Sequence, residues 1–76
     1  MNPLSPNELI PGQLYHIQSH KLYGHGKQKG YFVEFDKQYP TIAYFNNVED
    51  ILPRSGCLIG NIDFNTKLDI FYLPEN

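Results

Sequence analysis

The sequence predicts an all-β fold, a small antiparallel barrel of five short strands. Several short stretches alternate apolar with polar residues, and these stretches are rich in the β-branched and aromatic residues that favour strands. Residues that form turns separate them. A chain of 76 residues forms one domain with a modest core, since a domain of this size buries only about 60–65% of the surface of its unfolded chain.

The N-terminal residues differ from the rest in composition. Pro3, Pro6, Pro11 and Gly12 lie within the first twelve residues, and each proline removes a backbone donor and disfavours helix in the residue before it. We therefore expect residues 1–12 to form an extended arm. The single barrel domain is expected over residues 13–74.

Each predicted strand has one apolar face. The strands are expected at residues 13–20, 31–37, 41–47, 57–64 and 67–73. In the second strand Tyr31, Val33 and Phe35 alternate with Phe32 and more polar residues, so the first three are expected to face the core. The same pattern places these further side chains on core faces: Tyr15, Ile17, Ile42, Tyr44, Leu58, Ile62, Phe64, Leu68, Ile70 and Tyr72.

One short helical turn is expected after the third strand. Asn47 is a favoured N-cap residue, and Glu49 and Asp50 follow it as first-turn acids. Pro53 would end the turn. Five strands, a long first loop and one helical turn predict an SH3-like or Tudor-like barrel, with an OB-like barrel as the alternative. Closure of the barrel would protect the edges of the sheet.

Composition indicates a cytoplasmic protein. Cys57 is the only cysteine, so no internal disulfide can form, and small secreted domains usually depend on several. No segment approaches the ~20 apolar residues that span a membrane, and the N-terminus lacks the features of a signal peptide. The chain has a net charge of −2, but residues 20–30 contribute +3, which leaves −5 for the remainder.

The basic segment at residues 20–30 suggests a second kind of function. Its glycines would expose backbone amides, and its lysines could contact phosphates while a tyrosine stacks on a base. The nucleic-acid or phosphate hypothesis assigns this role to Lys21, Tyr23, His25, Lys27 and Lys29. The segment does not match the Walker A pattern. A solvated loop between two strands is the simpler interpretation, and overall acidity opposes nucleic-acid binding.

The aromatic residues favour a protein partner. Phe32, Phe45 and Phe71 fall on faces opposite the predicted core, and exposed rings are common anchors of interfaces. We expect a non-enzymatic interaction module, an adaptor, inhibitor or accessory subunit, that binds a protein through Tyr23, Phe32, Glu34, Asp36 and Phe45. An aromatic cage for a methylated ammonium is a weaker alternative, because most of the rings must fill the core.

The residues suited to metal binding or catalysis are few. His16, His20, His25 and Cys57 lack the spacing of a zinc site, so neither a metal nor another cofactor is expected. The carboxylates form no recognisable catalytic pair, and a chain this short has little room for an enclosed active site. The protein is expected to be a monomer or a homodimer paired through an exposed aromatic patch.

Overall fold

A computed structural model of the chain describes residues 2–20, 26–52 and 56–74. The protein is all-β, and its strands form one antiparallel sheet in the order β4-β3-β2-β1-β5, so the prediction of five antiparallel strands is confirmed. The elements are the 3-10 helix η1 (Pro6–Glu8), β1 (Leu14–Gln18), β2 (Lys27–Phe35), β3 (Ile42–Leu52), β4 (Cys57–Asn65) and β5 (Ile70–Tyr72).

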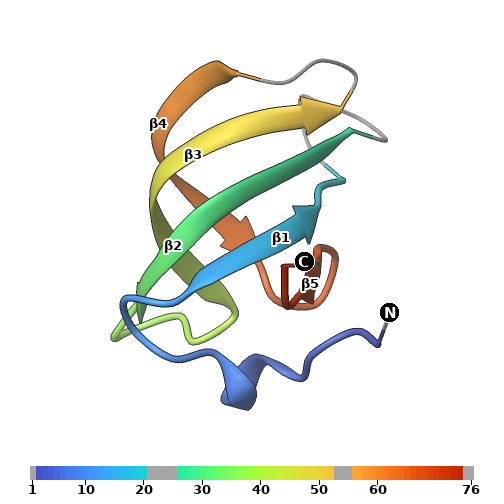
Figure 1. The fold of residues 1–76 in the computed structure, drawn as a ribbon. Coiled ribbons are helices and arrows are strands. Elements are labelled where there is room, and N and C mark those ends of the chain that lie inside the picture. The colour runs from blue at the N-terminus through green and yellow to red at the C-terminus, as the bar shows by residue number, and fades with distance from the viewer. Residues whose placement is uncertain (1, 21–25, 53–55, 75–76) are drawn as a thin grey trace.

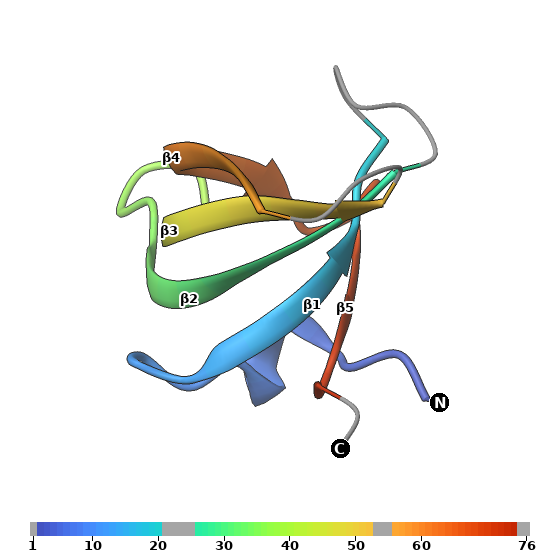
Figure 2. The same ribbon diagram turned by 45° about the horizontal axis from the view of Figure 1, so that its top comes forward.

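The sheet curls around its own core without closing. Figures 1 and 2 show β3 and β4 on one side and β1 and β5 on the other, with the long β2 bending between them. Within the described ranges β4 and β5 share no backbone ladder. Their side chains nevertheless meet inside the curl, where the rings of Phe64 and Phe71 lie 6.4 Å apart. A curled sheet therefore encloses a core that a flat sheet of this size could not.

The core is built from aromatic rings centred on Phe45. Its ring stacks on Phe71 at 5.5 Å between centroids and meets Phe64 edge-on at 5.4 Å. Phe32 and Tyr15 pack against it from β2 and β1. Tilted, stacked and edge-to-face rings each add attraction beyond the burial of their area. One residue on β3 thus joins side chains from all the other strands.

Several predicted side-chain orientations are wrong. Phe32, Phe45 and Phe71, expected to be exposed, are between 1% and 2% exposed, whereas Tyr31 and Tyr44 lie on the outer face. Phenylalanine has no polar atom and gains most from burial, while the tyrosine hydroxyl is easily satisfied at the surface. A register shift between Phe32 and Glu34 also breaks the simple alternation of β2.

Three more residues expected in the core are exposed: Leu58 on β4, Leu68 in the turn before β5, and Ile70 on β5. The predicted core positions Tyr15, Ile17 and Phe64 are correct, since each is at most 1% exposed.

The helical turn expected after Asn47 is also wrong, because β3 continues to Leu52. Asn47 instead adopts a positive φ of 51°, and the pairing of β3 with β4 shifts register between Phe45 and Val48. This bulge turns Val48 into the core, where it is fully buried. Pairing with strands on both sides and the burial of Val48 outweigh the local preference of an asparagine followed by acids for a helix start.

Part of the predicted loop at residues 20–30 is strand. β2 begins at Lys27, and Gln28 and Gly30 are buried. Gly30 lies so close to β3 that a Cβ atom there would be 2.7 Å from Val48 Cγ2. The glycine that suggested a loop therefore permits close packing of two strands.

The N-terminal residues pack against the sheet. The amide of Leu4 donates to the carbonyl of Phe71 at 2.8 Å, and Leu9 belongs to the core with 7% of its surface exposed. The buried Tyr15 hydroxyl accepts a hydrogen bond of 2.8 Å from the amide of Ile10. The segment thus covers the free edge of β5 with one bridge and adds an apolar side chain to the small core.

Candidate functional site

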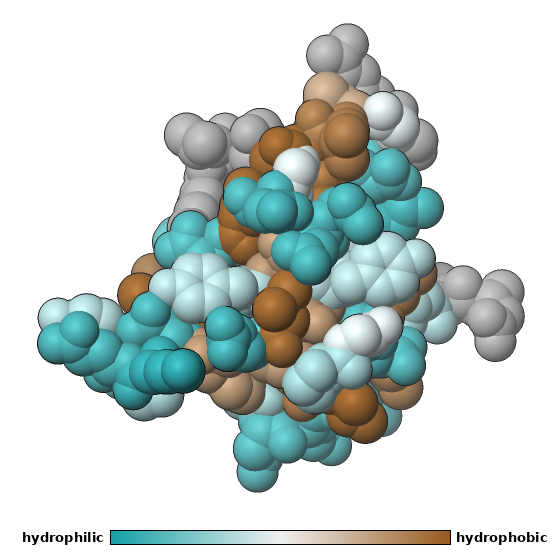
Figure 3. Space-filling model, turned by 90° about the vertical axis from the view of Figure 1, so that its left-hand side faces the viewer, coloured by the Kyte–Doolittle hydropathy of each residue, from teal (hydrophilic) through white to brown (hydrophobic). Residues whose placement is uncertain are grey.

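An acidic hollow of about 250 Å³ lies on the outer face of β2, β3 and β4. Its lining includes Val33, Glu34, Tyr44, Asn61, Ile62 and Asp63. Figure 3 views this side of the molecule, where hydrophilic residues surround a few apolar ones. Among the described residues, the lining contains two carboxylates, Glu34 and Asp63, so the hollow offers apolar contact together with acidic groups.

Strand register places the central side chains of the acidic hollow in one row. Tyr44 on β3 pairs with Glu34 on β2 and with Asp63 on β4. Residues directly opposite each other in an antiparallel sheet have neighbouring side chains on the same face. Tyr44, which is 38% exposed, is therefore flanked by a carboxylate on either side.

A third carboxylate, Asp36, fixes the position of this ring. The Tyr44 hydroxyl donates a short hydrogen bond to Asp36 Oδ1. The other oxygen of Asp36 accepts from the amides of Gln38 at 2.9 Å and Tyr39 at 2.8 Å, which closes the turn after β2. The loop and the ring hold each other, so the aromatic surface is organised before any ligand arrives.

The same contacts set the ionisation of the pair. The hydrogen bond from Tyr44 lowers the pKa of Asp36, and the backbone amides of Tyr39 and Gln38 lower it further. The hydrogen bond to Asp36 raises the pKa of Tyr44, to which burial and the charges of Asp36, Asp63 and Glu34 add. At neutral pH Asp36 is ionised and Tyr44 keeps its proton.

The structure brings together only part of the predicted protein-binding set. Glu34 and Asp36 lie on the outer face near Tyr44, as the acidic part of that set. Phe32 and Phe45 are core residues and present no exposed ring. Tyr23 lies outside the described residues.

Tyr44 and Asp63, which line the acidic hollow, were not part of the predicted protein-binding set, and Tyr44 was expected to face the core. The available signal was the run of polar residues Asn61 and Asp63 at alternate positions of the fourth strand, which marks a solvent-facing side. Tyrosine in place of phenylalanine at position 44 was a second sign of an outer position. Neither sign shows that Tyr44 lies between two carboxylates, because strand register decides that.

A second hollow, of about 240 Å³, lies on the outer face of the sheet and is lined by Leu14, Lys29, Tyr31, Asn47, Glu49 and Leu58. Lys29 Nζ lies 3.1 Å from Glu49 Oε1. The two opposite charges offset each other within this neutral hollow. Leu58 and Tyr31 are 68% and 43% exposed, so apolar surface meets solvent here.

The predicted basic site is divided. Lys27 and Lys29 lie on β2, whereas Lys21, Tyr23 and His25 fall outside the described residues. Lys29 pairs with a glutamate, and Lys27 Nζ lies 6.0 Å from the centre of the Tyr72 ring. Both described lysines therefore already have a partner for their charge.

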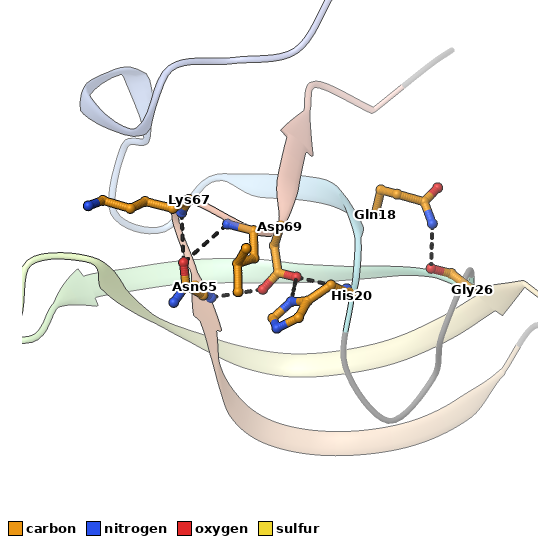
Figure 4. A network of polar contacts seen from close by, with 7 residues as sticks. Gln18, His20, Gly26, Asn65, Lys67 and Asp69 are labelled. Carbon is orange, nitrogen blue, oxygen red and sulfur yellow. Dashed lines mark hydrogen bonds and ion pairs between the residues drawn. The ribbon is translucent and has the colours of Figure 1, made fainter.

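His20, a histidine of that segment, belongs to a structural network that Figure 4 shows. Asp69, whose side chain is fully buried, accepts 2.9 Å and 2.8 Å hydrogen bonds from the amides of His20 and Asn65, and its Oδ1 also contacts His20 Nδ1. Asn65 Oδ1 in turn accepts from the amides of Lys67 and Leu68. The buried carboxylate thus ties the end of β1 to the turn between β4 and β5.

Over residues 2–20, 26–52 and 56–74, no group of three or more histidine, cysteine, aspartate or glutamate side chains is arranged to hold a metal ion. The described part of the chain also contains no helix long and apolar enough to cross a membrane. Cys57 is half-buried at the start of β4, where it pairs in register with Asp50.

Comparisons with protein-family models, with curated proteins and with solved structures found no match to this chain.

Proposed function

We propose that the protein is a non-enzymatic interaction module that binds a positively charged segment of a protein partner in the acidic hollow. The observation that carries the proposal is the cross-strand row Glu34–Tyr44–Asp63, with the ring held by Asp36. A lysine or arginine could pack its aliphatic stem against the apolar lining residues Val33 and Ile62. Its charged group would then contact the Tyr44 ring and the neighbouring carboxylates.

The proposed scaffold is a partly open SH3-like barrel of the cytoplasm. Five strands in one curled sheet support it, as does the core contact between β4 and β5. β3 ends at Leu52 and β4 begins at Cys57, which leaves no room for the helix that an OB-like barrel usually has there. The single cysteine fits a reducing compartment.

The first experiment titrates ¹⁵N-labelled protein with a blocked Gly/Ser peptide that carries one arginine. A matched peptide with glutamine in place of arginine is the control ligand. Binding in the acidic hollow should shift the amide signals of Glu34, Tyr44 and Asp63, and only for the arginine peptide. No shift in this row, or equal shifts with the glutamine peptide, would refute the proposal.

The Glu34→Gln/Asp63→Asn variant tests the role of charge. Removal of two exposed carboxylates should raise the dissociation constant of the arginine peptide by roughly 3- to 10-fold, because each exposed ion pair contributes about 0.2–1 kcal/mol. The control variant is Glu8→Gln, because Glu8 is an exposed acid on η1, outside the hollow. Its carboxylate accepts a hydrogen bond from the Ser5 amide, and the side-chain oxygen of a glutamine can accept the same bond. Glu8→Gln should bind like the wild type.

Nucleic-acid binding is the alternative function and needs its own experiment. Fluorescence anisotropy with labelled single-stranded and duplex oligonucleotides, at about 50 and 200 mM salt, measures it directly. Strong salt-dependent binding that a Lys27→Glu/Lys29→Glu variant abolishes would overturn the choice of a protein partner. The expected result is no salt-dependent binding, because both lysines already have a partner for their charge.

A further inference from the structure

The acidic hollow and the neutral hollow adjoin each other on the outer face of the sheet. Asn46 lines the first hollow and Asn47, the next residue of β3, lines the second. The two meet at the bulge, where the amide of Asn47 donates to Asn61 Oδ1 at 3.3 Å. The two hollows therefore lie next to each other along β3.

The two hollows differ in chemistry. The acidic hollow has two carboxylates in its described lining, and the carboxylate of Asp36 holds its tyrosine. In the neutral hollow Lys29 Nζ lies 3.1 Å from Glu49 Oε1, so these two charges offset each other. A charged ligand group would therefore gain little attraction there. The same hollow presents Leu58 with 68% of its surface exposed. An apolar side chain would gain the most from this second position.

We infer that the partner segment is an extended peptide that places a basic side chain in the acidic hollow and an apolar side chain in the neutral hollow. This inference rests on the proposed function of the acidic hollow and adds the second position. Tyr44 and Glu49, one from each hollow, are five residues apart on β3, which corresponds to roughly 16 Å of strand. In an extended peptide, side chains four to six positions apart cover about that length.

The alternation of side chains in an extended peptide limits the number of positions that can separate the basic residue from the apolar one. Successive residues of an extended chain point to opposite sides, so two side chains that face the same surface are separated by an even number of positions. Separations of four and six positions therefore fit, and five does not. The expected partner motif is a basic residue with a leucine-like residue four or six positions away.

The test compares three blocked Gly/Ser peptides by fluorescence anisotropy: one with an arginine, one with a leucine, and one with both at a separation of four positions. A further peptide with a separation of five controls for spacing. The leucine should tighten binding of the arginine peptide about fivefold, the gain expected when roughly half of its side chain leaves water. The five-position peptide should show no such gain.

The variant Leu58→Ser locates the effect. Leu58 is largely exposed, so its replacement leaves the core intact. Leu58→Ser should abolish the gain from the leucine while the arginine peptide binds as to the wild type. Leu68→Ser is the matched control, because Leu68 is 58% exposed and lines neither hollow. The full gain should persist in Leu68→Ser.

The outcomes separate this inference from the proposed function. If the arginine peptide binds and responds to Glu34→Gln/Asp63→Asn, but the leucine adds nothing or its gain survives Leu58→Ser, the two-hollow inference is wrong and the proposed function stands. If no arginine peptide binds, both are wrong. A concentration-dependent mass by light scattering that Leu58→Ser abolishes would show that a second copy of the chain occupies the neutral hollow, which also overturns the inference.

Discussion

Replacement of Gly30 by alanine tests the tight contact between β2 and β3. A Cβ atom at this position would lie 2.7 Å from Val48 Cγ2 and 3.3 Å from the carbonyl oxygen of Asn46. Val48 is fully buried and β-branched, so its methyl group has few alternative positions. Gly30→Ala must therefore displace Val48 or separate the two strands beside the bulge.

The expected loss follows from two opposing effects. Overpacking of a core typically costs about 1–3 kcal/mol. Replacement of glycine by alanine returns about 0.4–1 kcal/mol by restricting the unfolded chain. The net destabilisation should therefore be about 1–2 kcal/mol. A 76-residue domain has a total stability of about 4–11 kcal/mol, so the change is readily measured.

Urea denaturation followed by far-UV circular dichroism measures the free energy of unfolding. The compensating variant is Val48→Ala, which removes the methyl group that the new Cβ would meet. In the double variant Gly30→Ala should cost at least about 1 kcal/mol less than it does in the wild type, because neighbouring substitutions are not additive. A neutral Gly30→Ala, or additive effects in the double variant, would refute the reasoning.

Other predictions address the core, the bulge and the two polar networks. Phe45→Ala should lose about 3–5 kcal/mol in urea denaturation, because the residue joins rings from every other strand, and a smaller loss would contradict its central role. Asn47→Gly should change stability by no more than a few tenths of a kcal/mol, whereas Asn47→Val should lose roughly 1–2 kcal/mol, since φ at this position is 51°. Thermal unfolding distinguishes these two variants, and equal effects would argue against backbone conformation as the cause. Asp69→Asn should lower the free energy of unfolding by about 1–3 kcal/mol and speed hydrogen exchange at the amides of His20 and Asn65, which donate hydrogen bonds to the Asp69 carboxylate. Unchanged exchange at these amides would count against the network. The Tyr44–Asp36 hydrogen bond lowers the pKa of Asp36 from its usual 3.8 and raises that of Tyr44 from its usual 10.0, so its stabilising contribution is present between those two pH values. This contribution is lost as the pH falls through the lowered pKa of Asp36 or rises through the raised pKa of Tyr44. Tyr44→Phe should therefore be less stable than the wild type at neutral pH. A difference in stability between the two proteins that stays the same at every pH would disprove the assignment.

The sequence by itself determined the strand count and most strand positions. Alternation in residues 13–20 correctly placed Tyr15 and Ile17 in the core, because the opposite face of that strand is clearly more polar. The acidic residues Glu34 and Asp36 were also correctly placed outside the core, since an ionised side chain is rarely buried without a partner.

The tertiary structure alone decided which aromatic residues are buried. Both faces of β2 and β3 carry large apolar side chains, so alternation could not select between them, and the register shifts break the period of two. The choice depends on Phe45 meeting rings from strands far along the chain. Local sequence also favoured a helix at Asn47, where non-local pairing and the burial of Val48 favour a bulged strand.

The candidate site depends on the same non-local geometry. Glu34, Tyr44 and Asp63 are separated by ten or more residues in sequence, and only the register of β2, β3 and β4 sets them in one row. A change of one residue in that register would turn Tyr44 inward and remove the acidic hollow. Sequence therefore supplied the chemical groups of the site, and strand pairing decided which of them are neighbours.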